Sequence, residues 1–157
     1  MNPGQVIGRD LLDDLSAQAR QAARRRKNFN LHRSEQEPCN RLLNALEPDT
    51  YIAPHCHSEA AKDETMVMVR GRLGLVMFDD AGQVTGTVLL EAGGESVAVT
   101  IPHGLFHALV ALATGTIFFE AKAGPYRPLQ PEEKAAWAPA EGDPAAPAFL
   151  AKLKKLF

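Results

Sequence analysis

The sequence has few cysteines, no long apolar run and no excess of basic residues. Its two cysteines, Cys39 and Cys56, allow at most one disulfide, and we interpret both as thiols of a reducing compartment. No apolar run approaches the roughly 20 residues of a membrane-spanning helix. The chain has 17 basic and 19 acidic residues, a formal net charge of −2, whereas a general nucleic-acid-binding domain is normally basic. We therefore expect neither a nucleic-acid partner nor a membrane partner.

Residues 1–10 also lack the charged start and the apolar stretch of a signal peptide, so we expect a cytoplasmic location. Hydrophobic residues make up 45% of the chain and charged residues 23%, which are proportions typical of a globular domain. A length of 157 residues fits one such domain.

A helix is predicted over residues 8–27. Leucines and alanines recur at helical spacing between residues 11 and 23 and form one narrow apolar stripe. Asp10 is the expected N-cap, and the basic run at residues 24–27 suits the negative end of the helix dipole.

After residue 28 the hydrophobic period changes to two, and short runs of β-type residues alternate with turn residues. Helices between these runs are not evident, so the pattern favours an all-β sandwich or barrel over a parallel sheet with crossover helices. A helix over residues 42–46 stays open as an alternative. The expected strands are Phe29–His32, Asn40–Leu46, Tyr51–His57, Thr65–Val69, Leu73–Phe78, Gln83–Leu90, Ser96–Ile101, Phe106–Leu112 and Thr116–Lys122.

Proline and alanine dominate from residue 124 onward, which predicts an irregular surface segment followed by a short helix over Pro147–Leu156. We accordingly divide the single domain into an N-terminal helix (residues 1–27), a barrel (28–126) and a C-terminal wrap with its helix (127–157).

Four of the five histidines lie in two short clusters. His55 and His57 flank Cys56, and alternate residues of a strand share a face, so both imidazoles project together and form half of a divalent-metal site. Cys56 then points the other way. The alternative is that the two histidines share a surface position by chance and bind no metal.

Glu64 follows a polar loop and returns beside the histidine pair, although a solvated carboxylate is the alternative at this position. His107 begins an apolar strand, where a satisfied core histidine is the alternative to a metal ligand. His103 lies in the preceding turn and is expected to face solvent.

Together these residues resemble the two signature motifs of the cupin superfamily. The matching pattern is His55-x-His57, Glu64, Gly71 and Pro102-x-Gly104-x-x-His107. The resemblance implies an all-β cupin-type barrel (a double-stranded β-helix, or jelly roll) with an N-terminal helix and a short C-terminal helix. It also implies that His55, His57, Glu64 and His107 bind one metal ion inside the barrel. Glu59 is the other acid near the first motif, and the spacing to Gly71 favours Glu64. Three imidazoles and one carboxylate suit Zn, Fe, Mn, Ni or Co, and the ligand types do not choose among them.

Several further stretches resemble the WbuC-like cupin-fold metalloproteins, over roughly residues 7–145. They are Asn28–His32, Arg41–Leu46, Thr50–Ile52, Ala121–Tyr126 and Trp137–Gly142. Proteins of that family are associated with bacterial surface-polysaccharide (O-antigen) gene clusters. The resemblance thus implies a metal-binding cupin acting on a small anionic or sugar-like substrate. A non-catalytic, metal-dependent module that binds a small ligand is the alternative, and the sequence leaves open whether the protein is an enzyme.

His32, Arg41, Tyr51 and Lys62 are candidates for contacting such a small-molecule ligand. We also expect a homodimer, because the early strands at residues 29–32 and 40–46 lie outside the motif set and are free to cover exposed strand edges across an interface.

Overall fold

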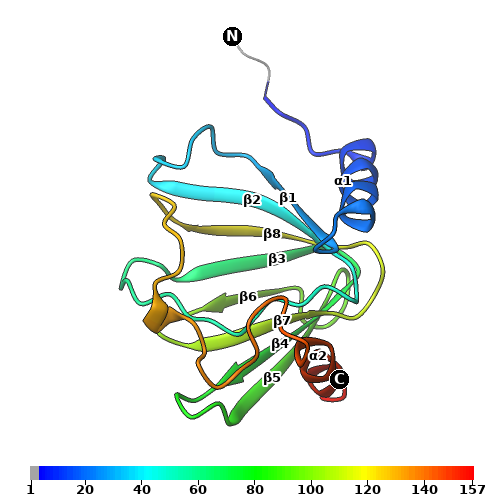
Figure 1. Ribbon diagram of the computed structural model, residues 1–157. Helices are drawn as coiled ribbons and strands as arrows, with labels where there is room; N and C mark the ends of the chain where they lie inside the picture. The colour runs from blue at the N-terminus through cyan, green and yellow to red at the C-terminus, as the bar shows by residue number, and fades with distance from the viewer. Residues whose placement is uncertain (1–3) are drawn as a thin grey trace.

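A computed structural model describes residues 4–157 as two facing antiparallel sheets with one helix near each end of the chain (Figure 1). The elements are α1 (Arg9–Gln21), β1 (Arg26–Asn30), β2 (Cys39–Leu46), β3 (Glu64–Arg70), β4 (Arg72–Phe78), β5 (Val84–Glu91), β6 (Ala98–Ile101), β7 (Phe106–Ala111), β8 (Thr116–Ala123), the 3-10 turn η1 (Pro131–Glu133) and α2 (Ala146–Lys154). The strand order is β1-β2-β8-β3-β6 in the larger sheet and β5-β4-β7 in the smaller. These eight strands confirm the all-β prediction.

The main core lies between the two sheets, where alternate residues of each strand meet. Met66, Met68 and Phe118 from the larger sheet pack with Leu75 and Leu109 from the smaller one, and all five are buried. Period-two alternation of apolar residues therefore builds this layer, as the sequence indicated.

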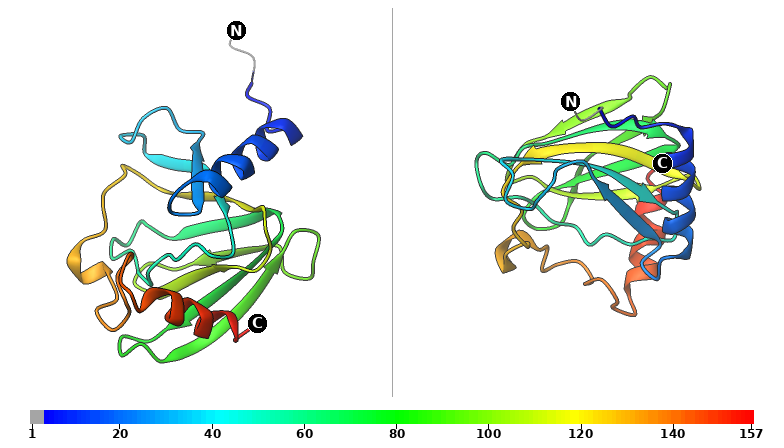
Figure 2. Two further views of the ribbon diagram at one scale, coloured as in Figure 1. Left: turned by 45° about the vertical axis from the view of Figure 1, so that its right-hand side comes forward. Right: turned by 90° about the horizontal axis from the view of Figure 1, so that it is seen from above.

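The two helices cover the outer faces of different sheets, α1 the larger sheet and α2 the smaller (Figure 2). Leu12 and Leu15 of α1 pack against Leu43, Ala45 and Ile117. Because Leu43 and Ala45 point to the helix, their neighbours in β2 point to the opposite, inner side of the sheet.

The N-terminal helix ends at Gln21, not at residue 27 as predicted. Arg25 has a φ of 55°, and Arg26 already begins β1, opposite Leu46. The Arg26 guanidinium donates to Glu141 at 2.8 Å, so contacts distant in sequence override the local helix signal. The N-cap prediction was also wrong, because Gly8 occupies that position and Asp10 lies in the first turn.

The stretch Tyr51–His57 is not a strand, although it was predicted as one. His55 alone makes isolated bridges, to His107 and to Lys134. The other predicted strands exist with ends shifted by a few residues, and residues 42–46 are strand rather than helix. Among the described residues, the structure has no helix with the length and apolarity that crossing a membrane would need.

Candidate metal centre

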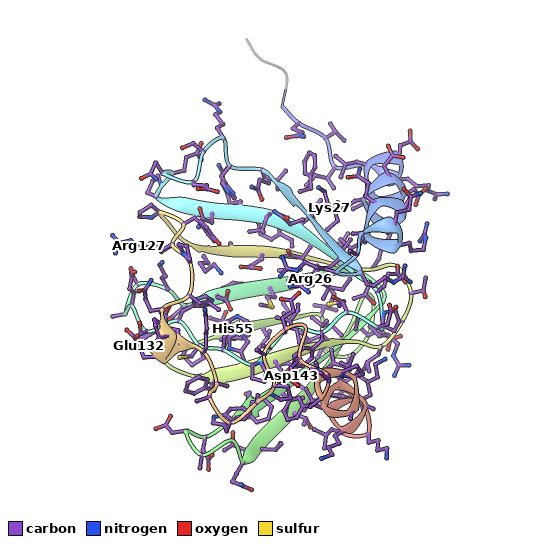
Figure 3. All side chains as sticks on the ribbon, in the orientation of Figure 1. Arg26, Lys27, His55, Arg127, Glu132 and Asp143 are labelled. Atoms are coloured by element: carbon purple, nitrogen blue, oxygen red, sulfur yellow. The ribbon has the colours of Figure 1, made fainter. Side chains whose placement is uncertain are left out.

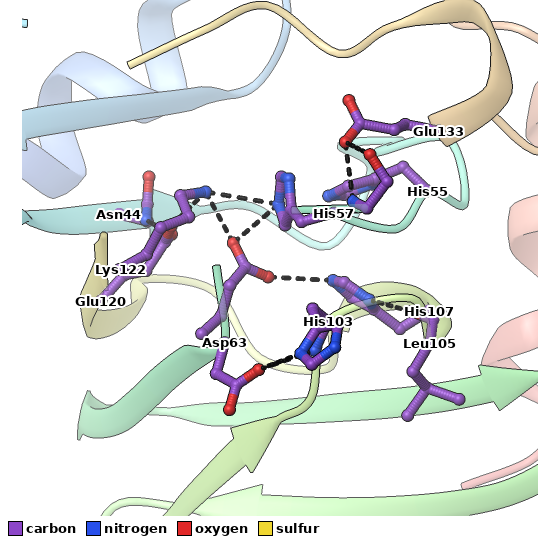
Figure 4. A network of polar contacts seen from close by, with 12 residues as sticks. Asn44, His55, His57, Asp63, His103, Leu105, His107, Glu120, Lys122 and Glu133 are labelled. Atoms are coloured by element: carbon purple, nitrogen blue, oxygen red, sulfur yellow. Dashed lines mark hydrogen bonds and ion pairs between the residues drawn. The ribbon is translucent and has the colours of Figure 1, made fainter. Parts of the chain in front are cut away.

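The predicted ligands come from three segments that the fold brings together, and Figure 4 shows His55, His57 and His107 side by side. His55 and His107 are joined by their backbones: His55 N–H donates to the His107 carbonyl at 3.1 Å, and His107 N–H donates to the His55 carbonyl at 2.9 Å. Glu64 begins β3, where it lies between Ile101 of β6 and Lys122 of β8. The pairing of distant strands therefore sets the spacing of these side chains.

The nitrogen and oxygen atoms that His55, His57 and Glu64 offer to a metal ion all lie within 4.8 Å of one another. His107 adjoins this group, with its ring centroid 4.7 Å from that of His55. Its Nε2 atom lies 3.2 Å from Glu64 Oε2. Cys56 is buried and is not a member of the group.

The tautomers of two histidines suit metal binding. The Nδ1 atoms of His55 and His107 lie 3.0 Å and 2.9 Å from the carbonyl oxygens of Ala53 and Leu105. A carbonyl only accepts hydrogen bonds, so each Nδ1 carries the proton and each Nε2 presents a lone pair. Carbonyl partners of this kind commonly orient metal-binding histidines.

The contact between His107 and Glu64 fits a site built for a cation. Both Glu64 Oε2 and His107 Nε2 are buried and have no hydrogen-bond partner among the described residues. Two acceptor atoms that face each other at 3.2 Å need a proton or a metal ion between them. Leaving such buried atoms unsatisfied costs about 1–3 kcal/mol each, and a shared metal ion would satisfy both. The residues present therefore fit a divalent ion.

The charges of the site favour its metal-binding form. Burial, followed by the nearby His107, lowers the pKa of His55 to about 4, so His55 is neutral at pH 7. Burial alone would raise the pKa of the Glu64 carboxyl, but the contacts with His107 and His57 and the charge of Lys122 outweigh it, and the pKa lies well below its usual range. Glu64 is thus an ionised carboxylate.

Lys122 and Glu120 are site residues that the sequence did not reveal. Lys122 Nζ lies 2.6 Å from Glu64 Oε1, 3.4 Å from His57 Nε2 and 2.9 Å from Glu120 Oε1. Burial would lower the pKa of Lys122, but the charges of Glu120 and Glu64 outweigh this effect and raise it. The available signal was the presence of two charged residues two positions apart in β8, whose other residues are apolar apart from Thr116.

A cavity of about 180 Å³ opens beside His55 and His57. Three of its lining residues are the cations Lys62, Lys122 and Arg127, and Figure 3 places Arg127 and His55 at the same end of the sheets. The full lining is Asn40, His55, His57, Lys62, Lys122, Ala123, Tyr126, Arg127 and Leu129.

The other residues considered from sequence are more dispersed. Lys62 lines this cavity, and His32 lines an adjoining one. The Arg41 side chain is half exposed and pairs with Glu37 at 3.0 Å. Tyr51 is buried, and its hydroxyl donates to the Pro139 carbonyl at 2.8 Å. The structure therefore does not bring Arg41 or Tyr51 to the histidine cluster.

The remaining polar residues near the motifs lie outside the cluster. His103 is half exposed and pairs with Asp63 at 2.8 Å. Glu59, the second acid considered for the first motif, is 47% exposed in its side chain and contacts Lys62 instead of the histidines.

Comparison with solved structures identifies the fold. KdgF from a Halomonas species is similar with a TM-score of 0.50 and 16% identity, over 65% of this chain and 82% of that one. The SPY1581 protein of unknown function from Streptococcus pyogenes is similar with a TM-score of 0.53 and 13% identity, over 81% of this chain and 93% of that one. The two facing sheets and these similarities show a jelly-roll fold of the cupin type.

Oxalate decarboxylase from Bacillus subtilis, described with Mn(II) centres, is similar with a TM-score of 0.49 and 18% identity. The similarity covers 66% of this chain and 26% of that one. No curated protein sequence matches this chain significantly. A family model does match residues 7–90, more than half of the 157 residues, and the chain therefore belongs to the family described as a Domain of unknown function (DUF6016).

Proposed function

We propose that this protein is a metal-binding cupin that acts on a small anionic substrate, with His55, His57, Glu64 and His107 holding one divalent ion. The observation that carries the proposal is the buried pair of His107 Nε2 and Glu64 Oε2, two acceptor atoms without a hydrogen-bond donor. A cation between them resolves this conflict.

A divalent ion at this position supplies a Lewis acid or lowers the pKa of a bound water molecule. With three neutral imidazoles and one carboxylate, the ion and its ligands carry a formal charge of about +1. Lys62, Lys122 and Arg127 add positive charge around the cavity. An anion entering the cavity meets these cations, and Lys122 would orient it beside His55 and His57.

The resemblance to WbuC-like proteins motivates a finer proposal, a role in the synthesis of a bacterial surface polysaccharide. The comparisons do not name that family, so this assignment stays a prediction. An acidic sugar would be both a small anion and a component of such a polysaccharide.

Metal content tests the proposed function directly. The protein is purified without added metal, incubated with Zn, Mn, Fe, Ni or Co and dialysed, and the metal per chain is measured. We expect about one ion per chain in the wild type, loss of the ion in the double variant His55→Ala/His57→Ala, and retention in the control His32→Ala. A wild-type chain that retains none of these metals contradicts the proposal. Retention of metal and ligand without turnover of any acid tested would identify a binding module instead of an enzyme.

A further inference from the structure

We propose that the cavity beside the histidines continues into a second, hydroxyl-binding cavity on the inner face of β1 and β2, so that the ligand is an anionic polyol. This inference rests on the proposed function and names its substrate class. The anionic end lies in the first cavity, among Lys62, Lys122 and Arg127, and the hydroxyl groups extend toward β1.

Strand register places polar residues in a row that leads away from the histidines. Asn40 of β2 is directly opposite Lys122 of β8, and Lys122 is directly opposite Glu64 of β3. Directly paired residues share a face of the sheet, so these three side chains all point inward. The next inward row runs from Glu120 through Leu42 to Asn30.

The second cavity has a volume of about 280 Å³ and adjoins the first. The two cavities share three lining residues, Asn40, Lys122 and Tyr126. One ligand that extends along these residues reaches both cavities. The full lining of the second cavity is Asn28, Asn30, His32, Glu35, Asn40, Leu42, Glu120, Lys122 and Tyr126.

Asn40 supplies the observation that points to a ligand. It is 4% exposed, and its Oδ1 atom has no hydrogen-bond partner among the described residues. The nearby Asn44 differs, because its Nδ2 donates to Glu120 Oε2 at 2.8 Å and thereby fixes that carboxylate (Figure 4). A ligand hydroxyl that donates to Asn40 would satisfy the unpaired oxygen.

The mixture of groups in the second cavity matches hydroxyl chemistry. Amides donate and accept, and a carboxylate such as that of Glu120 accepts, whereas each ligand hydroxyl does both. An apolar ligand would leave these groups unpaired at a cost in affinity. The half-exposed ring of Tyr126 offers an apolar face to the carbon backbone of a polyol.

Matched probes separate the two halves of the ligand. Isothermal titration of the metal-loaded protein uses two anionic polyols, gluconate and glucitol 6-phosphate, which distinguish a carboxylate from a phosphate end. Acetate and inorganic phosphate supply the anion alone, and glucitol supplies the hydroxyls alone. We expect one anionic polyol to bind at least about tenfold more tightly than its anion and than glucitol, as two or three added hydrogen bonds would give.

Two variants test whether the second cavity causes this preference. Asn40→Leu keeps the approximate volume and removes the amide, and Asn30→Ala changes an exposed residue whose loss does not threaten the fold. Each should weaken binding of the anionic polyol, by about tenfold for Asn40→Leu, while metal per chain stays unchanged. Asn30 lines only the second cavity, so Asn30→Ala should also leave affinity for the simple anion unchanged. Thr87→Ala, exposed on β5, is the control and should change neither affinity.

The possible failures are distinguishable. A chain without metal contradicts the proposed function and this inference together. A metal-loaded protein that binds acetate or phosphate as tightly as the polyols overturns only this inference. The same holds if Asn40→Leu and Asn30→Ala both retain the wild-type preference.

Discussion

Lys122 Nζ lies 2.6 Å from Glu64 Oε1, while the other oxygen of the same carboxylate faces His107 Nε2 at 3.2 Å. Both oxygens of Glu64 therefore face the histidine cluster, because Oε1 also lies 3.0 Å from His57 Nε2, and Oε1 contacts an internal ammonium group as well. The ammonium group partly neutralises the carboxylate before any metal ion arrives, and it also repels that ion.

Replacing this lysine should therefore separate stability from metal affinity. In the metal-free protein, we expect Lys122→Met to lower the free energy of unfolding by about 3 kcal/mol, because it leaves buried carboxylates without their cation. Added metal should then raise the melting temperature of the variant more than that of the wild type. Lys152→Met is the control, since Lys152 is exposed on α2 and does not line the cavity, and its shift should match the wild type. If metal raises the melting temperatures of Lys122→Met and wild type equally, Lys122 does not compete with the metal ion for Glu64.

The four proposed ligands should differ in how much metal their loss costs. Glu64→Gln keeps the size and one acceptor oxygen but removes the negative charge, so metal affinity should fall. His107→Ala removes a ligand outright and should cost more metal. His103→Ala should cost little, because His103 is half exposed and pairs with Asp63. The measurement is metal per chain after equal dialysis, and the assignment of the second motif is wrong if His103→Ala loses more metal than His107→Ala.

Cys56 lies between two proposed metal ligands in the sequence, but we expect it not to bind the metal ion. Its thiol is buried outside the histidine cluster, and burial raises the pKa of that thiol, which disfavours the thiolate that would bind a metal. Cys56→Ser should leave metal per chain unchanged. Loss of one equivalent of metal, with the variant still folded by circular dichroism, would count against the proposed ligand set.

Much of the barrel could be predicted because period-two alternation is a local signal. The strand at residues 64–70 and its partners follow from alternating apolar residues and turn glycines such as Gly71, whose φ is 74°. The clustering of His55 with His57 also follows from an extended backbone, even though that stretch pairs with no full strand. Local backbone geometry and the spacing of the cupin motif were enough to predict these two features.

The rest depends on contacts that sequence spacing does not reveal. Lys122 reaches Glu64 only because β8 lies between β2 and β3, a strand order that no local pattern encodes. The basic run after residue 23 fits a helix end equally well, and its place in β1 depends on distant partners such as Glu141, the Tyr51 carbonyl and strand β2. Side chains contributed by such nonlocal pairing were the ones that sequence analysis missed.

The homodimer stays a prediction, and the edge strand β1 is the surface where we expect the two copies to meet. Within residues 4–157, β1 pairs with β2 alone and forms an edge of the larger sheet, and exposed edges favour pairing with another strand. Light scattering at micromolar concentration should give twice the monomer mass. Asn28 lies between the hydrogen-bonded pairs of the β1–β2 ladder, so its N–H points to the free edge. Asn28→Pro would remove this outward donor and should shift the mass toward the monomer. Asn28→Ala, which keeps the donor, is the control, and a monomeric wild type would contradict the prediction.

Glu133 should make stability fall in acid. Its carboxylate accepts hydrogen bonds from the Ser58 N–H, the Ser58 hydroxyl and the Gln130 N–H, each at 2.8 Å. Burial acts to raise its pKa, but these donors outweigh burial and lower the pKa to about 2. The stabilisation is therefore present above the unfolded-state pKa of 4.5 and is lost as the pH falls through 2.

The loss amounts to about 3 kcal/mol at most, at 1.36 kcal/mol per pKa unit. Glu133→Gln should lower stability at pH 7 and flatten its dependence on pH between 4.5 and 2, because glutamine has no charge to titrate. The exposed neighbour Glu132 provides the control, and Glu132→Gln should keep the wild-type slope. Urea denaturation at a series of pH values measures both. An unchanged dependence of stability on pH in Glu133→Gln would rule out this stabilising role of the Glu133 carboxylate.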